Sequence, residues 1–204
     1  MKLADHLQEV FDRDLIQFLS QGIGGNPFFK GTDQILFLEI LEQLLNHPDL
    51  NSQMDLENNR MIYKKYYNIN IAVDTEDGLV VPVIRGVDKL SIRQLTAGIM
   101  EAAEKARERK LTLDDFKDGT FTVTNYGSIA GTYAVPVINY PQVGILGIGR
   151  IMKIPVVKDD EVTVGRVLPL SMSVDHRIVD GGEAARFMLK LKELLKDPVS
   201  LLLL

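Results

Sequence analysis

Apolar residues recur at three- and four-residue steps in four stretches of the chain, which predicts four amphipathic helices. We expect them over residues 3–20, 32–46, 91–110 and 182–196. The second helix begins at Thr32, a suitable N-cap, and ends before Pro48. The third opens with Ser91-Ile-Arg-Gln94, a capping box in which the serine and glutamine side chains each bond the other's backbone N–H.

Between the second and the last helix, short runs of apolar and extended-favouring residues predict β-strands joined by turns. These runs cover residues 60–65, 68–74, 78–86, 118–128, 134–139, 143–151, 154–157 and 162–174. The last two predict a hairpin around Lys158-Asp159-Asp160. Helices and strands do not alternate strictly, which favours an α+β fold with a mixed or antiparallel sheet covered by helices.

The composition bounds the function. The 204 residues, 46% of them hydrophobic, suit one domain with one core, spanning residues 1–204. A net charge of −5 argues against nucleic acid or an anionic membrane as a partner. We find no 18-residue apolar run and no signal peptide, so we expect a cytoplasmic protein; a mature organellar matrix protein would have the same features. The absence of cysteine excludes disulfides and a thiol nucleophile, so any reacting thiol belongs to a substrate.

The strongest candidate for chemistry is the stretch Ser171-Met-Ser-Val-Asp-His-Arg-Ile-Val-Asp-Gly-Gly182, where a strand is predicted to run into a helix. His176 lies there between Asp175 and Arg177, four residues before Asp180. Such junctions can direct a base into a cleft. A histidine in a capping and salt-bridge network is the alternative.

The other two histidines suit structural roles. His47 precedes a proline at a helix end, which is typical of a C-terminal cap or a surface residue. His6 falls on the polar face of the first predicted helix. With His176 as the single good ligand candidate, we expect no metal site.

Four segments resemble the catalytic domain of dihydrolipoamide acyltransferases of 2-oxo acid dehydrogenase complexes. The segments are Lys64-Lys-Tyr-Tyr-Asn-Ile-Asn-Ile-Ala-Val-Asp74, Gly78-Leu-Val-Val-Pro-Val-Ile84, Thr122-Val-Thr-Asn-Tyr-Gly127 and Asp175-His-Arg-Ile-Val-Asp-Gly181, in the family's order. The resemblance implies a chloramphenicol-acetyltransferase-like fold. It also implies acyl transfer between coenzyme A and a lipoyl dithiol.

The resemblance also implies residue roles. His176 is the expected general base, and Thr124 the expected hydroxyl donor to the tetrahedral oxyanion; on its own, Thr124 suits an ordinary strand position equally well. Asn125, Gly127 and Gly181 are expected to shape the turns of the site. In the family, the aspartate matching Asp180 holds the site together by pairing with a basic group. Asp175 and Arg177 likewise suit structural roles.

The resemblance further implies an active site between subunits, within trimers that assemble into cores of 24 or 60 copies. Residues 1–31 depart from the family, because its basic N-terminal helix and following strand are not recognisable there. No lipoyl or peripheral-subunit-binding domain is apparent, so the lipoyl group is expected from another chain or from free dihydrolipoamide. The tail Leu201-Leu-Leu-Leu204 is expected to be buried against this chain or a neighbour.

Three functions remain open from the sequence. The first is an active coenzyme A-dependent dihydrolipoamide acyltransferase. The second is a catalytically weak or inactive scaffold that assembles with full-length acyltransferase chains, which the unusual residues 1–31 favour. The third is an acyltransferase of the same fold that acts on a small alcohol or amine. Arg177 after the histidine favours the lipoyl type over the antibiotic-modifying type.

Overall fold

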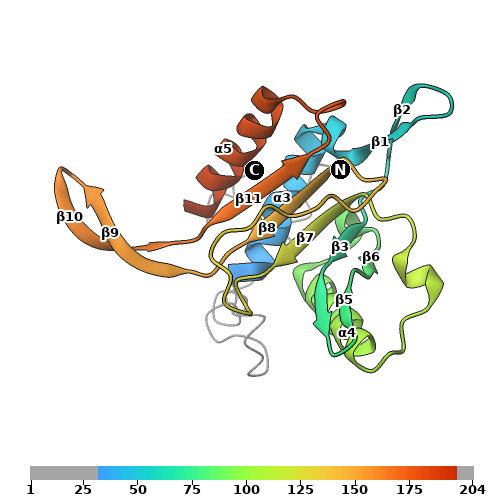
Figure 1. Cartoon of the computed structure of the whole chain (residues 1–204), viewed down its shortest axis with the longest axis horizontal. Coiled ribbons are helices and arrows are strands. Elements are labelled where there is room, and N and C mark those ends of the chain that lie inside the picture. The colour runs from blue at the N-terminus through green and yellow to red at the C-terminus, as the bar shows by residue number, and fades with distance from the viewer. Residues whose placement is uncertain (1–31, 197–204) are drawn as a thin grey trace.

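A five-stranded mixed sheet forms the centre of the computed structural model, which describes residues 32–196 (Figure 1). Its strand order is β11-β8-β7-β3-β6. Strands β3, β7 and β8 run parallel, while β6 and β11 pair antiparallel at the two edges. The bounds are β3 Ile69–Ile71, β6 Val83–Ile84, β7 Phe121–Asn125, β8 Gly144–Ile148 and β11 Leu170–Val174.

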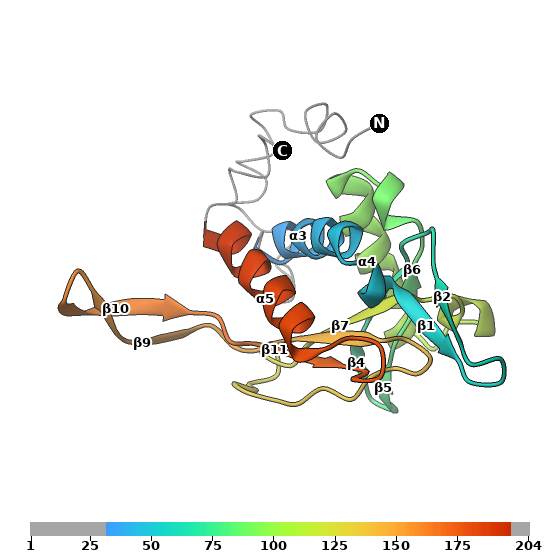
Figure 2. The ribbon, with the colours of Figure 1, turned by 90° about the horizontal axis from the view of Figure 1, so that it is seen from above.

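The helices α3 (Thr32–Asn46), α4 (Ile92–Arg107) and α5 (Gly181–Lys196) lie on one side of this sheet (Figure 2). Helix α3 packs between the other two, with more contact to α5. Helix α4 begins with the predicted capping box, in which Ser91 accepts the N–H of Gln94 and Gln94 accepts the N–H of Ser91. The predicted helices at 32–46, 91–110 and 182–196 are therefore confirmed, with α4 ending three residues earlier than expected.

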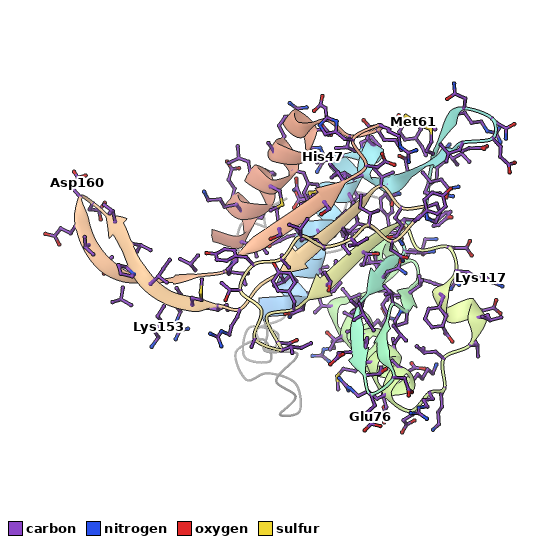
Figure 3. The ribbon with its side chains drawn as sticks, viewed as in Figure 1. His47, Met61, Glu76, Lys117, Lys153 and Asp160 are labelled. Atoms are coloured by element: carbon purple, nitrogen blue, oxygen red, sulfur yellow. The ribbon has the colours of Figure 1, made fainter. Side chains whose placement is uncertain are left out.

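Three two-stranded sheets and three short 3-10 helices complete the described fold. The hairpins are β1 (Ser52–Asp55) with β2 (Arg60–Tyr63), β4 (Val73–Thr75) with β5 (Gly78–Val80), and β9 (Met152–Lys158) with β10 (Glu161–Val167); the 3-10 helices are η1 (Pro48–Asn51), η2 (Val87–Lys89) and η3 (Leu113–Phe116). The β9–β10 hairpin projects far from the body, with Asp160 at its tip (Figure 3).

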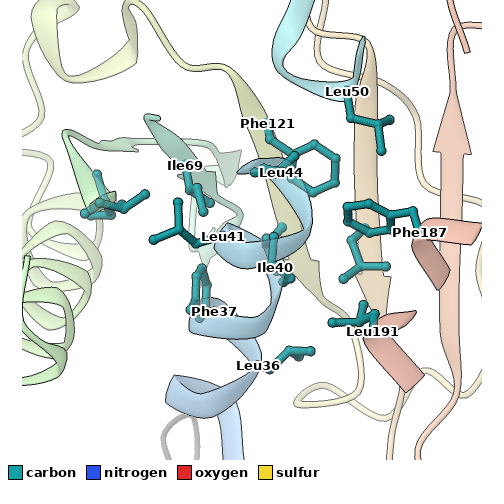
Figure 4. Packing of buried hydrophobic residues seen from close by; sticks show 14 of the residues in the cluster. Leu36, Phe37, Ile40, Leu41, Leu44, Leu50, Ile69, Phe121, Phe187 and Leu191 are labelled. Carbon is teal, nitrogen blue, oxygen red and sulfur yellow. The ribbon is translucent and has the colours of Figure 1, made fainter. Parts of the chain in front are cut away.

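The core lies between the sheet and the three helices, and the part formed with α3 and α5 is shown in Figure 4. Phe121 of β7 and Phe187 of α5 are fully buried, with ring centroids 6.1 Å apart. Along β7, Phe121 and Val123 belong to this core, so alternation turns Thr122 and Thr124 to the opposite face. Each fully buried large apolar side chain contributes about 2 kcal/mol through removal from water.

Several predicted strands are divided in the structure. The run 68–74 becomes β3 and β4 in different sheets, and the run 78–86 becomes β5 and β6 around Pro82. The run 162–174 becomes β10 and β11, which are separated near Pro169, a residue that cannot donate a ladder hydrogen bond. The predicted strand at 134–139 is wrong, since these residues form a loop in which Val135 and Val137 are exposed. The helix expected over 3–20 and the Leu201–Leu204 tail lie outside the described residues.

Candidate active site

His176 lies in a tight turn between the end of β11 and the start of α5. The N–H of Asp175 donates to the carbonyl of Val143 at 2.8 Å. The carbonyl of Asp175 accepts the N–H groups of Ile178 and Val179 at 2.9 and 3.0 Å. The backbone of the turn is therefore fixed, while the imidazole ring is exposed on the single chain.

The two acidic residues of the turn have structural contacts. The guanidinium of Arg177 donates to both carboxylate oxygens of Asp175, and these bonds hold the pKa of Asp175 below its usual range. Oδ1 of Asp180 accepts the N–H of Glu183 at 2.7 Å, so Asp180 is the N-cap of α5. This bond is the main cause that lowers the pKa of Asp180, with smaller contributions from the N–H of Gly182 and the charge of Arg186.

The described residues include no basic side chain in an ion pair with Asp180, since Arg186 pairs with Glu183 instead. Gly181 follows Asp180 as the first residue of α5, and a Cβ at this position would meet no atom within 4 Å. The space beside the start of α5 is therefore open on the single chain.

Thr124 lies near the end of β7, half-buried, on the sheet face that carries no described helix. No hydrogen bond to its hydroxyl is formed by any residue in the range 32–196, so the hydroxyl is available to a ligand. The turn that follows is held by Asn125, whose Oδ1 accepts the N–H of Ser128 at 3.2 Å. Gly127 donates its N–H to Ile148 at 3.1 Å, and a Cβ at Gly127 would collide with the backbone of Gly149.

Buried hydrogen bonds also hold the far end of the loop between β7 and β8 against the helix-free face of the sheet. The Thr122 hydroxyl lies 2.5 Å from Oε1 of Gln142, and Nε2 of Gln142 donates to Oδ1 of Asn70 at 2.6 Å. All three side chains are buried. A polar network thus fixes the helix-free face two residues before Thr124.

The sheet register separates Thr124 from His176 within one chain. Thr124 pairs with Gly147, and Gly147 pairs with Ser171, so these three residues lie abreast. Ser171 lies three residues before the end of β11 at Val174, about 10 Å along the strand, and His176 follows in the turn beyond that end. The two residues therefore lie toward opposite ends of the sheet. One chain does not bring them together.

Sequence reasoning missed two side-chain pairs that connect distant elements. His47, expected as a cap or surface residue, is partly buried, and its Nδ1 lies 2.6 Å from Oε1 of Glu183 in the first turn of α5. The Tyr126 and Ser171 hydroxyls lie 3.2 Å apart across β8. A serine at the start of the conspicuous motif was the available signal for the second pair, but nothing in the sequence indicated its partner.

A surface groove of about 450 Å³ lies between β6 and α4, and none of the predicted site residues lines it. Residues 32–196 hold no group of three or more His, Asp or Glu side chains arranged to bind a metal ion. Within the same residues, no helix is both long and apolar enough to span a membrane.

Comparison with known proteins gives a consistent result. Residues 34–203 match the family model of the 2-oxoacid dehydrogenases acyltransferase (catalytic domain). The chain is 45% identical over 164 residues to the dihydrolipoyllysine-residue acetyltransferase component of the pyruvate dehydrogenase complex of Staphylococcus aureus, covering 80% of this chain and 38% of that protein. The chain thus spans about a third of the length of the curated relatives it matches.

Solved structures show the same fold. A structure from a study of a serine, a histidine and an asparagine in the catalytic mechanism of Azotobacter vinelandii dihydrolipoamide acetyltransferase superposes with a TM-score of 0.77 at 41% identity, covering 84% of this chain and 70% of that one. The structure of the cubic core of a pyruvate dehydrogenase multienzyme complex superposes with a TM-score of 0.77 at 43% identity, covering 82% of this chain and 70% of that one. A chloramphenicol acetyltransferase superposes with a TM-score of 0.52 at 14% identity, covering 80% of this chain and 77% of that one. The predicted α+β, chloramphenicol-acetyltransferase-like fold is confirmed.

Proposed function

Because the chain belongs to the family of 2-oxoacid dehydrogenases acyltransferase catalytic domains, we propose that it transfers an acyl group between coenzyme A and the dithiol of dihydrolipoamide. The observation that carries this proposal is the match over residues 34–203, which includes both the His176 turn and the end of β7. The Thr124 hydroxyl, free of hydrogen bonds within the described residues, supports a role toward a ligand.

In the proposed mechanism, His176 is the general base. A thiol has an ordinary pKa of about 8.5 and an imidazole one of about 6.5, so a neutral imidazole can accept the thiol proton as sulfur attacks the thioester carbonyl. Formation of the new carbon–sulfur bond produces a tetrahedral oxyanion. The hydroxyl of Thr124 donates a hydrogen bond to this oxyanion. When the intermediate collapses, the original carbon–sulfur bond breaks. The departing thiolate then takes the proton back from His176.

Asp180 is proposed to support the base without carrying a proton. In the Azotobacter vinelandii protein, the studied histidine and asparagine are four residues apart, and Asp180 is likewise the fourth residue after His176 here. Asp180 caps α5 through the N–H of Glu183, which fixes the end of the His176 turn. Asn125, Gly127 and Gly181 are proposed to shape the two turns of the site.

We propose that the complete site forms between two copies of this chain. The sheet register keeps Thr124 and His176 too far apart to act together in one copy. Self-association is further supported by the β9–β10 hairpin, which extends away from the body of the chain (Figure 1). One face of the hairpin carries Pro155, Val157, Val162 and Val164, and the three valines are 73–77% exposed. An isolated hairpin with an apolar face is unstable in water and needs a covering surface.

The proposed assembly is a homotrimer that builds a larger core of 24 or 60 subunits, in line with the cubic core among the similar structures. Coenzyme A and the lipoyl dithiol are substrates of this site, and the lipoyl group is supplied in trans by a lipoyl-bearing chain or as free dihydrolipoamide. The bacterial relatives favour a cytoplasmic reaction.

The test is acyl transfer from acetyl-, isobutyryl- and succinyl-coenzyme A to dihydrolipoamide. We expect turnover with one of these donors, a loss of about 100- to 10,000-fold in His176→Ala, and a loss of about 100- to 1,000-fold in Thr124→Ala. His6→Ala is the matched histidine control and should retain the full rate. An assembled chain without turnover for any donor would contradict the proposal and favour the scaffold alternative.

A further inference from the structure

Three residues form a row across the helix-free face of the sheet. Thr124, Gly147 and Ser171 pair in register on the adjacent strands β7, β8 and β11. Paired residues on adjacent strands point to the same face, so a side chain at the middle position would separate the Thr124 and Ser171 hydroxyls. Glycine at this position leaves a gap between them.

The ring of Tyr126 fills this gap. A Cβ built on Gly147 would lie 2.7 Å from Cε1 of Tyr126 and 3.4 Å from Cγ of Pro136. The ring therefore occupies the space that any larger residue at this position would need. It reaches across β8 from the end of β7, and its hydroxyl lies 3.2 Å from Oγ of Ser171. Either hydroxyl can donate, and the distance is long for a hydroxyl pair, so packing contributes much of the contact.

The other side of the Tyr126 ring is equally constrained. A Cβ on Gly131 would lie 2.7 Å from Cδ2 of Tyr126. The Tyr126 carbonyl accepts the N–H groups of Gly131 and Ile129 at 2.9 and 3.2 Å. Two glycines thus form the space for the ring, and the backbone turn holds it there.

We propose that Tyr126 is a positioning residue that fixes the Thr124 hydroxyl as the oxyanion donor. Tyr126 is two residues after Thr124, and its ring covers the sheet position directly beside Thr124. The ring anchors the end of β7 to β11 through Ser171, which limits movement of the strand end that carries the hydroxyl. A donor that is held in place needs no reorganisation as the oxyanion develops. This inference rests on the proposed role of Thr124.

The proposal predicts a specific kinetic signature. The donor acts on charge that exists only in the transition state, so a looser Thr124 lowers kcat and leaves both KM values unchanged. A tyrosine that served only fold stability would change the thermal midpoint instead. A tyrosine that bound substrate would change KM.

The experiment is a double-mutant cycle between Tyr126→Phe and Thr124→Ala, with Ser171→Ala as a second way to remove the hydroxyl contact. We expect Tyr126→Phe and Ser171→Ala each to lower kcat by about threefold to tenfold, with both KM values within about twofold of the parent. In the Thr124→Ala background, Tyr126→Phe should cause no further loss, because its effect acts through the missing hydroxyl. Tyr63→Phe is the matched control, since it removes a tyrosine hydroxyl bonded to Asp49 at 2.9 Å.

The outcomes separate this inference from the proposed function. If Thr124→Ala is slow but Tyr126→Phe lowers the rate equally in both backgrounds, or changes only KM, the positioning role is overturned and the proposed function stands. A full rate in Thr124→Ala would overturn the oxyanion role and the positioning role together. An unchanged kcat in Tyr126→Phe and Ser171→Ala, with assembly intact, would also overturn the inference.

Discussion

Nδ1 of His47 lies 2.6 Å from Oε1 of Glu183, which ties the end of α3 to the first turn of α5. The edge of the His47 ring also packs on Phe187, with centroids 5.7 Å apart. Glu183 is the residue whose N–H is capped by Asp180. The contact therefore links the main core helix to the helix start that follows the His176 turn.

Loss of this contact should destabilise the fold. We expect His47→Ala to lower the free energy of unfolding by about 1–3 kcal/mol, since a partly buried carboxylate loses its partner. Urea unfolding measures the change. Asn46→Ala, at the exposed neighbouring position, is the control and should change stability by less than about 0.5 kcal/mol.

The same contact predicts a pH dependence. The hydrogen bond from His47, and then that from Arg186, hold the pKa of Glu183 below its ordinary value of 4.5. A carboxyl with a lowered folded-state pKa adds stability above pH 4.5, and this stability is lost as the pH falls through the folded-state value. The difference between the parent chain and Glu183→Gln should therefore shrink as unfolding is measured at successively lower pH. A constant difference down to pH 3 would contradict this.

A buried carboxyl on α3 predicts the opposite pH dependence. Burial, and then the charge of Glu42, raise the pKa of Glu39 from 4.5 to about 8. Both of its carboxyl oxygens are buried, and no residue in the described range 32–196 forms a hydrogen bond to them. The folded state thus binds a proton that the unfolded state releases, so the stability is greatest below pH 4.5 and is lost as the pH rises through about 8.

Glu39→Gln removes this dependence. The variant should match the parent chain near pH 5 and exceed its stability at pH 9, by on the order of 1–4 kcal/mol. Chemical unfolding at the two pH values tests the expectation. Glu104→Gln, on the exposed face of α4, is the control. Equal effects of Glu39→Gln at both pH values would show that Glu39 does not titrate on unfolding.

A site shared between copies predicts complementation between two inactive variants. In an equal mixture of His176→Ala and Thr124→Ala chains assembled together, each head-to-tail interface has a one-in-four chance of an intact pair. We expect about a quarter of the parent activity from such mixed rings. Separately assembled variants mixed afterwards are the control. No recovery after co-assembly would contradict a shared site, because it would mean that His176 and Thr124 must come from the same chain.

Charge on the apolar face of the β9–β10 hairpin should disrupt the proposed assembly. Val162→Glu together with Val164→Glu places charge on its apolar face, which should split the assembly into smaller species and lower activity at least about tenfold. Analytical ultracentrifugation measures the size. Leu113→Glu places the same charge at an exposed apolar residue elsewhere, on η3, and should leave the assembly intact. Full-sized assemblies of the double variant would exclude this face from the contacts.

The sequence predicted those elements whose signals are local. The Ser91 capping box, the three described helices and the strand that carries Thr124 all depend on residues within a few positions of one another. The division of the run 162–174 into β10 and β11 was missed because apolar periodicity continues across Pro169 while the pairing partner changes. Residues 134–139 have the amino-acid composition of a strand, but they pair with no strand among residues 32–196.

The site was predicted less completely, because its contacts join distant segments. Tyr126 and Ser171 are 45 residues apart, and His47 and Glu183 are 136 apart. No periodic pattern reports such pairs. Similarly, the motifs made His176 and Thr124 candidates, but only the strand register shows that they lie toward opposite ends of one sheet.

The separation of Thr124 and His176 along the sheet also implies that the proposed reaction can begin only after assembly. If the site forms between copies as proposed, a newly synthesised chain carries the proposed base and hydroxyl but no complete site. On this proposal, an unassembled chain should not react with acyl thioesters, and dilution that separates the copies should abolish turnover while every chain stays folded. The rate per chain should therefore measure the fraction of chains that have assembled into complete trimers.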